Sequence, residues 1–180
     1  PRMTFAEAMA RYGSDRPDLR FEMFLTDLSD IVCDSEFRVF SGTIASGGQV
    51  KAICAHGCGD YTRRQIDELT DLVKKLGAKG LAWIAVGETG VRSPIKKFLK
   101  KEELQAILNR LRAAPGDLIL IVAAVPAVVA SCLGELRLEM GRRLGLMDND
   151  VLAFAWVVEF PLLKWDEEEQ RFSAEHHPFT

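Results

Sequence analysis

The spacing of hydrophobic positions changes repeatedly along this 180-residue chain, and each change predicts a separate element. Apolar residues recur at helical spacing in five places, which predicts helices over residues 4–12, 27–32, 62–76, 101–112 and 126–144. Alternating or continuous apolar runs predict strands over residues 36–40, 50–55, 81–86 and 118–123. Pairs of strands therefore alternate with helices, a pattern typical of an α+β layer sandwich.

Capping signals mark the starts of two of these helices. Thr4 is followed three residues later by Glu7, and Thr62 is followed in the same way by Gln65. In such a capping box the threonine side chain and the later Glu or Gln side chain bind each other's backbone N–H groups. Both helices are therefore predicted to begin at these threonines.

A β-hairpin is predicted ahead of the helix over residues 62–76. Residues 36–40 alternate between polar and apolar side chains, as in a strand with one buried face. Residues 46–48 (Ser-Gly-Gly) mark a turn, and residues 50–55 supply a second strand. We therefore expect the two strands to pair through a loose connection.

Polar stretches near both ends divide the chain into three parts. Pro17 and its polar neighbours interrupt the pattern first, and residues 147–150 (Met-Asp-Asn-Asp) interrupt it again. The predicted organisation is a compact unit over residues 21–148, flanked by segments 1–20 and 149–180.

The second flank has an unusual composition for its length. Residues 151–160 are almost wholly apolar, which predicts a strand buried on both faces within a larger sheet. A tail of about 30 residues cannot cover such a strand by itself. The chain also lacks an initial Met and stops within the segment HHPFT, so we expect a piece of a larger protein.

Composition restricts the class of protein. With 23 Lys and Arg against 26 Asp and Glu, the net charge of −3 argues against binding nucleic acid by bulk positive charge. The most apolar stretch, Leu118–Leu133, is interrupted by Pro126 and is shorter than the ~20 residues of a membrane span. No secretory signal is evident, so we expect a cytoplasmic protein without membrane contact, in which the four cysteines stay reduced.

The motif Cys54-Ala55-His56-Gly57-Cys58 is the most obvious candidate for a metal site, since thiolate and imidazole ligands suit zinc. A structural zinc site needs four ligands, and no second Cys/His pair lies nearby; Cys33, Cys132 and the late histidines could approach only through folding. The favoured interpretation is the end of a hairpin, with Cys54 in the core and His56 in solvent. No metal site is predicted.

A local basic cluster could contact RNA phosphates: Arg92, Lys96, Lys97, Lys100 and Lys101. No aromatic residues that would stack on bases alternate with these cations, and Glu102 and Glu103 follow directly. A solvated helix face is therefore favoured, and no nucleic-acid patch is predicted. The acidic run 166–169 is interpreted as a solvent-facing turn, and no phosphate-binding glycine motif is present.

The final histidine pair, His176 and His177, precedes Pro178. Two imidazoles can donate hydrogen bonds to an anion or carboxylate. Adjacent residues of a strand point to opposite faces, so at most one of the two would face a given pocket. No catalytic residue is predicted anywhere in the chain.

Seven segments, taken in order, resemble bacterial-type aspartyl-tRNA synthetases. They are MTFAEAMARYGSDRPDLRF, GAKGLAWIAV, SPIKKFL, PGDLILIVA, LGELRLEMGRRLGL, FAWVVEFPLLKWDEEEQRF and HHPFT. The resemblance covers nearly the whole chain. One departure is Arg16, where the family usually has Lys; this keeps the charge but changes the hydrogen-bond geometry.

This resemblance implies a class II synthetase in which a GAD domain is inserted into an antiparallel catalytic sheet. The GAD domain has a two-layer α/β sandwich fold with paired antiparallel strands and helices, which agrees with the compact unit 21–148. The flanks 1–20 and 149–180 would then be fragments of the catalytic sheet.

The resemblance also implies a two-step reaction, in which aspartate reacts with ATP to give aspartyl-adenylate and the aspartyl group then moves to the 3′ end of tRNA(Asp). Mg²⁺ assists, and the family is homodimeric. Of the family's site residues only HHPFT carries over, which assigns His176, with His177 as its neighbour, to the aspartate pocket.

By itself, the chain is expected to be inactive and to bind no cofactor. A monomer is compatible with this expectation. The alternative interpretation is a free-standing GAD-type interaction module, like that of the glutamyl-tRNA amidotransferase B subunit.

Overall fold

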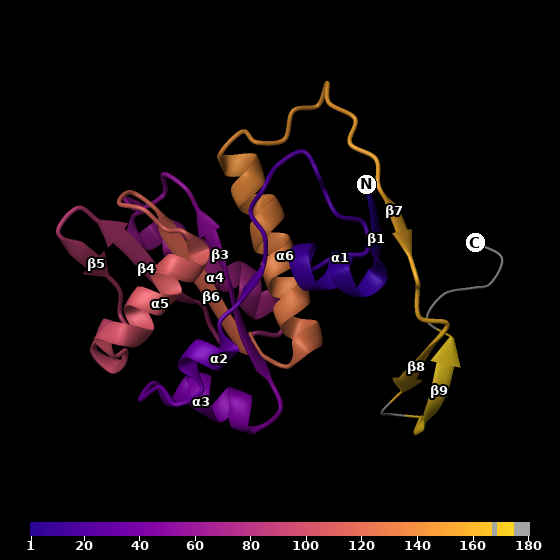
Figure 1. The fold of residues 1–180 in the computed structure, drawn as a ribbon, viewed down its shortest axis with the longest axis horizontal. Helices are drawn as coiled ribbons and strands as arrows, with labels where there is room; N and C mark the ends of the chain where they lie inside the picture. The colour runs from indigo at the N-terminus through magenta and orange to yellow at the C-terminus, as the bar shows by residue number, and fades with distance from the viewer. Residues whose placement is uncertain (167–168, 175–180) are drawn as a thin grey trace.

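The computed structural model describes residues 1–166 and 169–174. Its centre is a five-stranded sheet in the order β2-β3-β6-β4-β5, with every neighbouring pair antiparallel (Figure 1). The strands are β2 (Thr26–Asp27), β3 (Gln49–Ala55), β4 (Ala82–Gly87), β5 (Gly90–Arg92) and β6 (Leu118–Ala124). The two longest strands, β3 and β6, pair over their whole length in the middle of the sheet.

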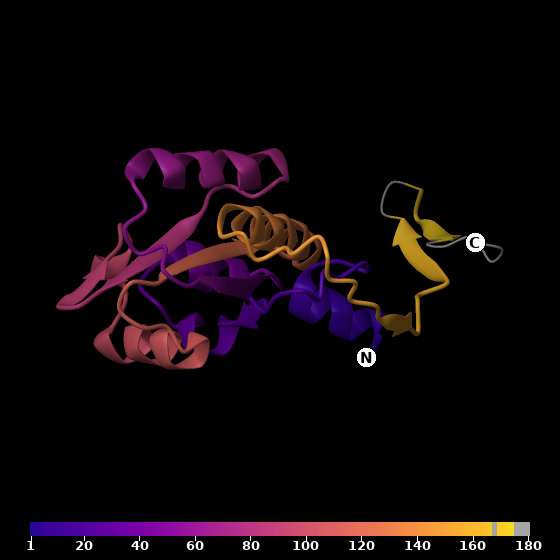
Figure 2. The same ribbon diagram turned by 90° about the horizontal axis from the view of Figure 1, so that it is seen from above.

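Helices cover both faces of this sheet (Figure 2). One face carries α4 (Arg63–Lys75) and α6 (Pro126–Arg143); the other carries α2 (Ser29–Val32), α3 (Arg38–Ala45) and α5 (Lys101–Leu111), with the 3₁₀ turn η1 (Lys96–Phe98) before α5. The predicted α+β class with antiparallel strands and helices is confirmed. The expected sandwich had one sheet layer and one helical layer, and the structure adds a second helical layer on the other face of the sheet.

The central strands explain why their sequences are almost continuously apolar. Successive side chains of β6 point to opposite faces, so Leu118 and Leu120 enter the core under α4 and α6, whereas Ile119 and Ile121 enter the core under α2, α3 and α5. All four are at most 1% exposed. A strand buried on both faces cannot alternate polar with apolar residues.

The most apolar stretch, Leu118–Leu133, forms β6 and the first part of α6, as predicted. Pro126 occupies the first turn of α6, where its missing N–H is not needed. Among the residues that the structure describes, no helix combines the length and the apolar character needed to cross a membrane.

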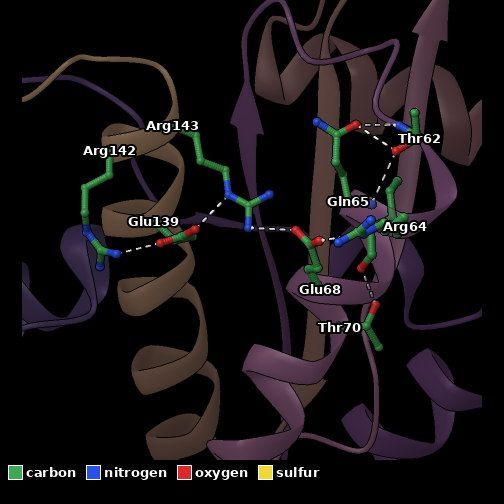
Figure 3. Close-up of polar contacts among 9 residues, drawn as sticks. Thr62, Arg64, Gln65, Glu68, Thr70, Glu139, Arg142 and Arg143 are labelled. Atoms are coloured by element: carbon green, nitrogen blue, oxygen red, sulfur yellow. Dashed lines mark hydrogen bonds and ion pairs between the residues drawn. The ribbon is translucent and has the colours of Figure 1, made fainter.

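Both predicted capping boxes are confirmed. Thr4 caps α1 (Phe5–Tyr12) with Glu7, and Thr62 caps α4 with Gln65, as Figure 3 shows for α4. The same view shows how α4 is held beside α6, because Glu68 of α4 accepts from Arg143 of α6 at 3.4 Å.

The predicted hairpin over residues 36–55 is wrong. Residues 38–45 form α3, and β3 pairs with β2 and β6 instead. Phe37, Phe40 and Ile44 lie three and four residues apart, so on a helix they share one face, and all three belong to the core on that side of the sheet. Helical burial of Phe40, which is 1% exposed, overrides the short alternating pattern.

The two flanks meet beside the central unit. β1 (Arg2–Thr4) pairs in parallel with β7 (Trp156–Val158), while β8 (Leu163–Asp166) and β9 (Arg171–Ala174) form an antiparallel hairpin (Figure 1). The predicted extent of the strand over residues 151–160 is wrong, since only Trp156–Val158 forms a strand; its burial within a larger sheet stays a prediction. Leu152, Phe154 and Trp156 are 77–79% exposed, so this segment finds little cover among the described residues.

Candidate functional site

The predicted aspartate-pocket residues His176 and His177 lie outside the described residues, which end at residue 174. Within the described part, four places combine unusual chemistry with definite geometry. They are the face of α6 that holds the N-terminal segment, the loop after β3, the basic cluster and an apolar groove beside α3.

The face of α6 that holds the N-terminal segment is formed by Gly134, Arg137 and Gly141. Successive members are three and four residues apart, so they lie on one side of the helix. Each glycine makes room for a neighbour. A Cβ on Gly134 would lie 2.8 Å from the carbonyl oxygen of Gly13, and one on Gly141 would lie 2.7 Å from the ring of Phe21. This face is therefore shaped for the segment that follows α1.

Arg137 is the polar centre of that face and is only 1% exposed. Its Nε donates to the carbonyl of Met23 at 3.0 Å, and its Nη2 donates to the carbonyls of Asp18 at 2.9 Å and Phe21 at 2.7 Å. The guanidinium also lies 3.9 Å from the centre of the Phe21 ring. Burial lowers the pKa of Arg137, although Asp18 and Tyr12 act in the opposite direction; a guanidinium nevertheless stays charged in proteins.

Arg20 joins the two ends of the compact unit. Its Nε and Nη2 bind the two carboxylate oxygens of Asp18 at 3.0 and 2.7 Å, and its Nη1 donates to the carbonyl of Asp148 at 2.9 Å. The hydrogen bond from Arg20 lowers the pKa of Asp18 against the effect of burial. The chain therefore enters the unit and leaves it at one point, close to both predicted boundaries.

The loop after β3 brings Cys54, His56 and Asp117 together. The Nδ1 of His56 lies 2.9 Å from Oδ2 of Asp117, and the Sγ of Cys54 lies 3.8 Å from the same oxygen. Cys54 is 7% exposed, as predicted for a core residue, and the His56 side chain is 71% exposed, as predicted for a solvated one. Sequence reasoning missed Asp117, because 61 residues separate it from His56.

Two backbone N–H groups hold the Asp117 carboxylate in place, in addition to its contacts with Cys54 and His56. Its Oδ1 accepts from the backbone N–H of Gly57 at 3.1 Å, and its Oδ2 accepts from that of Ala114 at 2.9 Å. Burial raises the pKa of this carboxyl, but the hydrogen bonds from Ala114, His56 and Gly57 outweigh it and leave the pKa lowered. Burial, together with the neighbouring Asp117 charge, raises the pKa of Cys54 to about 12.

Part of the predicted basic cluster is engaged in local structure. Arg92 donates to the carbonyls of Gly59 and Tyr61, both at 3.1 Å, and lies 5.5 Å from the centre of the Trp83 ring. The lysines of the cluster are exposed, in agreement with the favoured solvated face, and Lys97 lies over the ring of its neighbour Phe98.

An apolar groove lies between α3 and the segment that joins α4 to β4. Its volume is about 640 Å³, and its lining includes Phe37, Val39, Leu81, Val125 and Val128, with Arg38 and Lys79 among its charged residues. Its size matches small-molecule sites, but neither its lining nor its charges select one occupant.

Comparison with known proteins identifies what this arrangement resembles. A family model described as the GAD domain matches residues 40–133. The chain is 59% identical over 180 residues to an aspartate–tRNA(Asp/Asn) ligase of Symbiobacterium thermophilum, and the match covers 99% of the chain. It is 54% identical to the ligases of the same name from Moorella thermoacetica and Bacillus cytotoxicus, over 100% of the chain.

The chain spans about 30% of the length of these curated relatives. The resemblance predicted from the seven sequence segments is thereby confirmed. The match to the relatives includes both flanks, whereas the GAD model covers only part of the compact unit.

Proposed function

Because the chain belongs to the GAD domain family and is similar along its whole length to aspartate–tRNA(Asp/Asn) ligases, we propose that it works as part of such a ligase in the cytoplasm. The observation that carries this proposal is the extent of the match, which includes 99–100% of the chain. A free-standing GAD module, the alternative interpretation, would account for similarity in the compact unit but not in the flanks.

The geometry of the flanks supports the same proposal. Arg20 binds the carbonyl of Asp148, so the compact unit 21–148 begins and ends at one place. Beyond that point the flanks continue side by side and pair as β1 and β7. This is the arrangement expected of a domain inserted between two neighbouring strands, with 1–20 and 149–180 belonging to the body that carries the strands.

In the complete ligase, we propose that aspartate attacks the α-phosphate of ATP and that the aspartyl group then moves to tRNA(Asp) and, as the relatives' names say of them, to tRNA(Asn). The parent is proposed to be a class II homodimer. His176, with His177 beside it, would donate a hydrogen bond to the substrate aspartate.

Magnesium, which such a reaction uses, does not fit the described residues. The one cluster of metal-type donors in residues 1–166 and 169–174 contains a thiol and an imidazole. Mg²⁺ prefers oxygen ligands in octahedral geometry. We therefore assign no step of the ligase reaction to a magnesium ion held by these residues.

The proposal is tested first by aspartate-dependent exchange of pyrophosphate into ATP. The 180-residue chain alone is expected to give no exchange above background, because the chemistry needs the remaining 70% of the ligase. Robust exchange by the isolated chain would contradict this.

A chimera tests the positive half of the proposal. This chain replaces the matching segment of the Symbiobacterium thermophilum ligase, and aspartylation of tRNA is expected to be retained within about tenfold, since 59% identity preserves most buried contacts. In that chimera, His176→Ala is expected to reduce kcat/KM for aspartate by roughly tenfold to a hundredfold while KM for ATP changes little. Cys33→Ser, at an exposed position, is the matched control. Unchanged aspartate kinetics in His176→Ala would refute the assignment.

A further inference from the structure

We propose that Cys54, His56 and Asp117 form a binding site for a single divalent cation of the zinc class. The site goes beyond the ligase activity, because it lies in the compact unit and uses none of the proposed aspartate-pocket residues. From the sequence alone, no metal site is predicted at the Cys-Ala-His-Gly-Cys motif. The structure reverses that prediction, because it brings Asp117 to Cys54 and His56 as a third donor.

Two of the three distances between the donor atoms are already close to those around a metal. The three atoms are all within 4.8 Å of one another, with 3.8 Å between Cys54 Sγ and Asp117 Oδ2 and 2.9 Å between His56 Nδ1 and the same oxygen. Tetrahedral zinc ligands at their usual bond lengths are about 3.3–3.6 Å apart. The imidazole must move to bring all three atoms onto one ion, and it has room to do so because the His56 side chain is 71% exposed.

Asp117 Oδ2 now accepts from both of the other donors, so two protons occupy the space between the three atoms. A cation placed there would replace both protons. The Cys54 thiol would release its proton to solvent and bind as thiolate, and His56 would carry its proton on Nε2 and bind through Nδ1. The two negative charges of Cys54 and Asp117 then balance a divalent ion, and a solvent molecule can take the fourth position.

The remaining contacts of Asp117 support the site from outside. The backbone N–H groups of Gly57 and Ala114 fix the orientation of the carboxylate, in the way that outer hydrogen bonds orient ligands in known metal sites. Cys54 and Asp117 are buried while His56 reaches solvent, so the cation has an entry path on the His56 side.

The donor set selects the class of metal. One thiolate, one imidazole and one carboxylate suit Zn²⁺ and its analogue Co²⁺, whereas Ca²⁺ and Mg²⁺ prefer oxygen ligands throughout. Once bound, the ion would join the end of β3 to the turn before β6, two segments that lie 60 residues apart in sequence. We therefore expect the metal to stabilise the compact unit.

Cobalt titration tests the proposal, because thiolate-bound Co²⁺ has a charge-transfer band in the near ultraviolet and tetrahedral Co²⁺ absorbs strongly in the visible. The full chain, reduced and freed of metal, is expected to show both signals at one equivalent, and added Zn²⁺ should remove them. Cys54→Ser should lose the thiolate band. His56→Ala, at an exposed position, should weaken Co²⁺ binding by roughly tenfold or more.

The matched controls are Cys33→Ser and Cys58→Ser, whose sulfur atoms lie outside the three-atom cluster, and both should bind Co²⁺ like the parent chain. Circular dichroism of each variant confirms that it is folded. The proposal is overturned if the parent chain gives no thiolate band at millimolar Co²⁺, if the band persists in Cys54→Ser, or if His56→Ala binds as tightly as the parent.

Discussion

The two flanks of the compact unit differ in how well the described residues cover them. The N-terminal flank is fitted to α6, where Gly134 leaves room for the backbone at Gly13 and buried Arg137 binds the carbonyl of Asp18. The same guanidinium also binds the carbonyls of Phe21 and Met23, at the start of the compact unit. The C-terminal flank leaves Leu152 and Phe154 almost fully exposed.

Coverage by neighbouring residues distinguishes a segment that packs within its own chain from one that packs against other residues. A flank that packs within the same chain is matched by small residues and by satisfied polar groups on the surface that receives it. A flank whose partners lie elsewhere keeps large apolar side chains that nothing nearby covers. If the chain works as part of a ligase, as proposed, we expect the exposed apolar side chains of the C-terminal flank to pack against other parts of that protein. The N-terminal flank already packs against α6 of the compact unit.

Arg137→Met tests the fitted side of this comparison and should have the largest effect. The substitution leaves three carbonyls without their donor while keeping an unbranched side chain, so we expect the free energy of unfolding to fall by about 3–5 kcal/mol. Urea denaturation followed by circular dichroism measures it. Arg142→Met on the same helix is the control, because Arg142 makes only exposed ion pairs with Glu135 and Glu139 and should lose less than about 1 kcal/mol. Equal losses in both variants would contradict the special role of Arg137.

Gly134→Ala tests the close approach of the two backbones. The new Cβ would lie 2.8 Å from the carbonyl oxygen of Gly13, so α1 must move, and we expect a loss of about 1–3 kcal/mol despite the higher helix propensity of alanine. Gly42→Ala in α3 is the matched control, since its new Cβ would meet no atom within 4 Å beyond its chain neighbours and the nearby backbone of its own helix. That variant should gain up to about 1 kcal/mol. A Gly134→Ala variant as stable as Gly42→Ala would show that α1 can shift without loss.

Asp18→Asn tests the ion pair at the entry to the unit, and its effect should depend on pH. The folded-state pKa of Asp18 is lowered by Arg20, so the ion pair adds stability above the unfolded-state pKa and loses it as pH falls through the folded-state value. We expect Asp18→Asn to lower the free energy of unfolding by about 1–2 kcal/mol at pH 7. The difference from the parent chain should shrink below about pH 4. A difference that stays constant down to pH 2.5 would exclude this ion pair as its cause.

Phe154→Ser tests the other flank and should have the smallest effect on stability. Phe154 is 79% exposed, so its replacement should change the free energy of unfolding of this chain by less than about 0.5 kcal/mol. Binding of a hydrophobic dye to the native chain should decrease in the same variant. A loss comparable to that of Gly134→Ala would mean that the segment 151–155 is packed against the unit after all.

Local sequence rules predicted the helices well because their signals are local. The capping boxes at Thr4 and Thr62, and the apolar stripe of α4, depend on residues within a few positions of one another. Residues 36–40 show the limit of such rules, since a five-residue alternation is compatible with a helix once Phe37, Phe40 and Ile44 are counted together.

The polar contacts of the candidate sites could not be predicted from the sequence, because they join residues that are far apart along the chain. Arg137 reads as a surface cation in its helix, and only the fold brings the carbonyls of residues 18–23 to it. Asp117 reads as part of a Pro-Gly-Asp turn, and only the register of β3 with β6 places it beside His56. In both cases the contact depends on residues that are distant in sequence, so no local pattern indicates it.

The pairing of β1 with β7 has a consequence for the order in which the protein assembles. Arg2 and Trp156 are roughly 150 residues apart, and closing an unstructured loop of that length costs about 4 kcal/mol in chain entropy. Once Arg20 and Asp148 are held together by the folded unit, only about 25 residues remain to be closed, which lowers this cost by about 1.5 kcal/mol. Independent folding of the middle of the chain would thus convert a slow, distant encounter into a local one, with the two strands joining last.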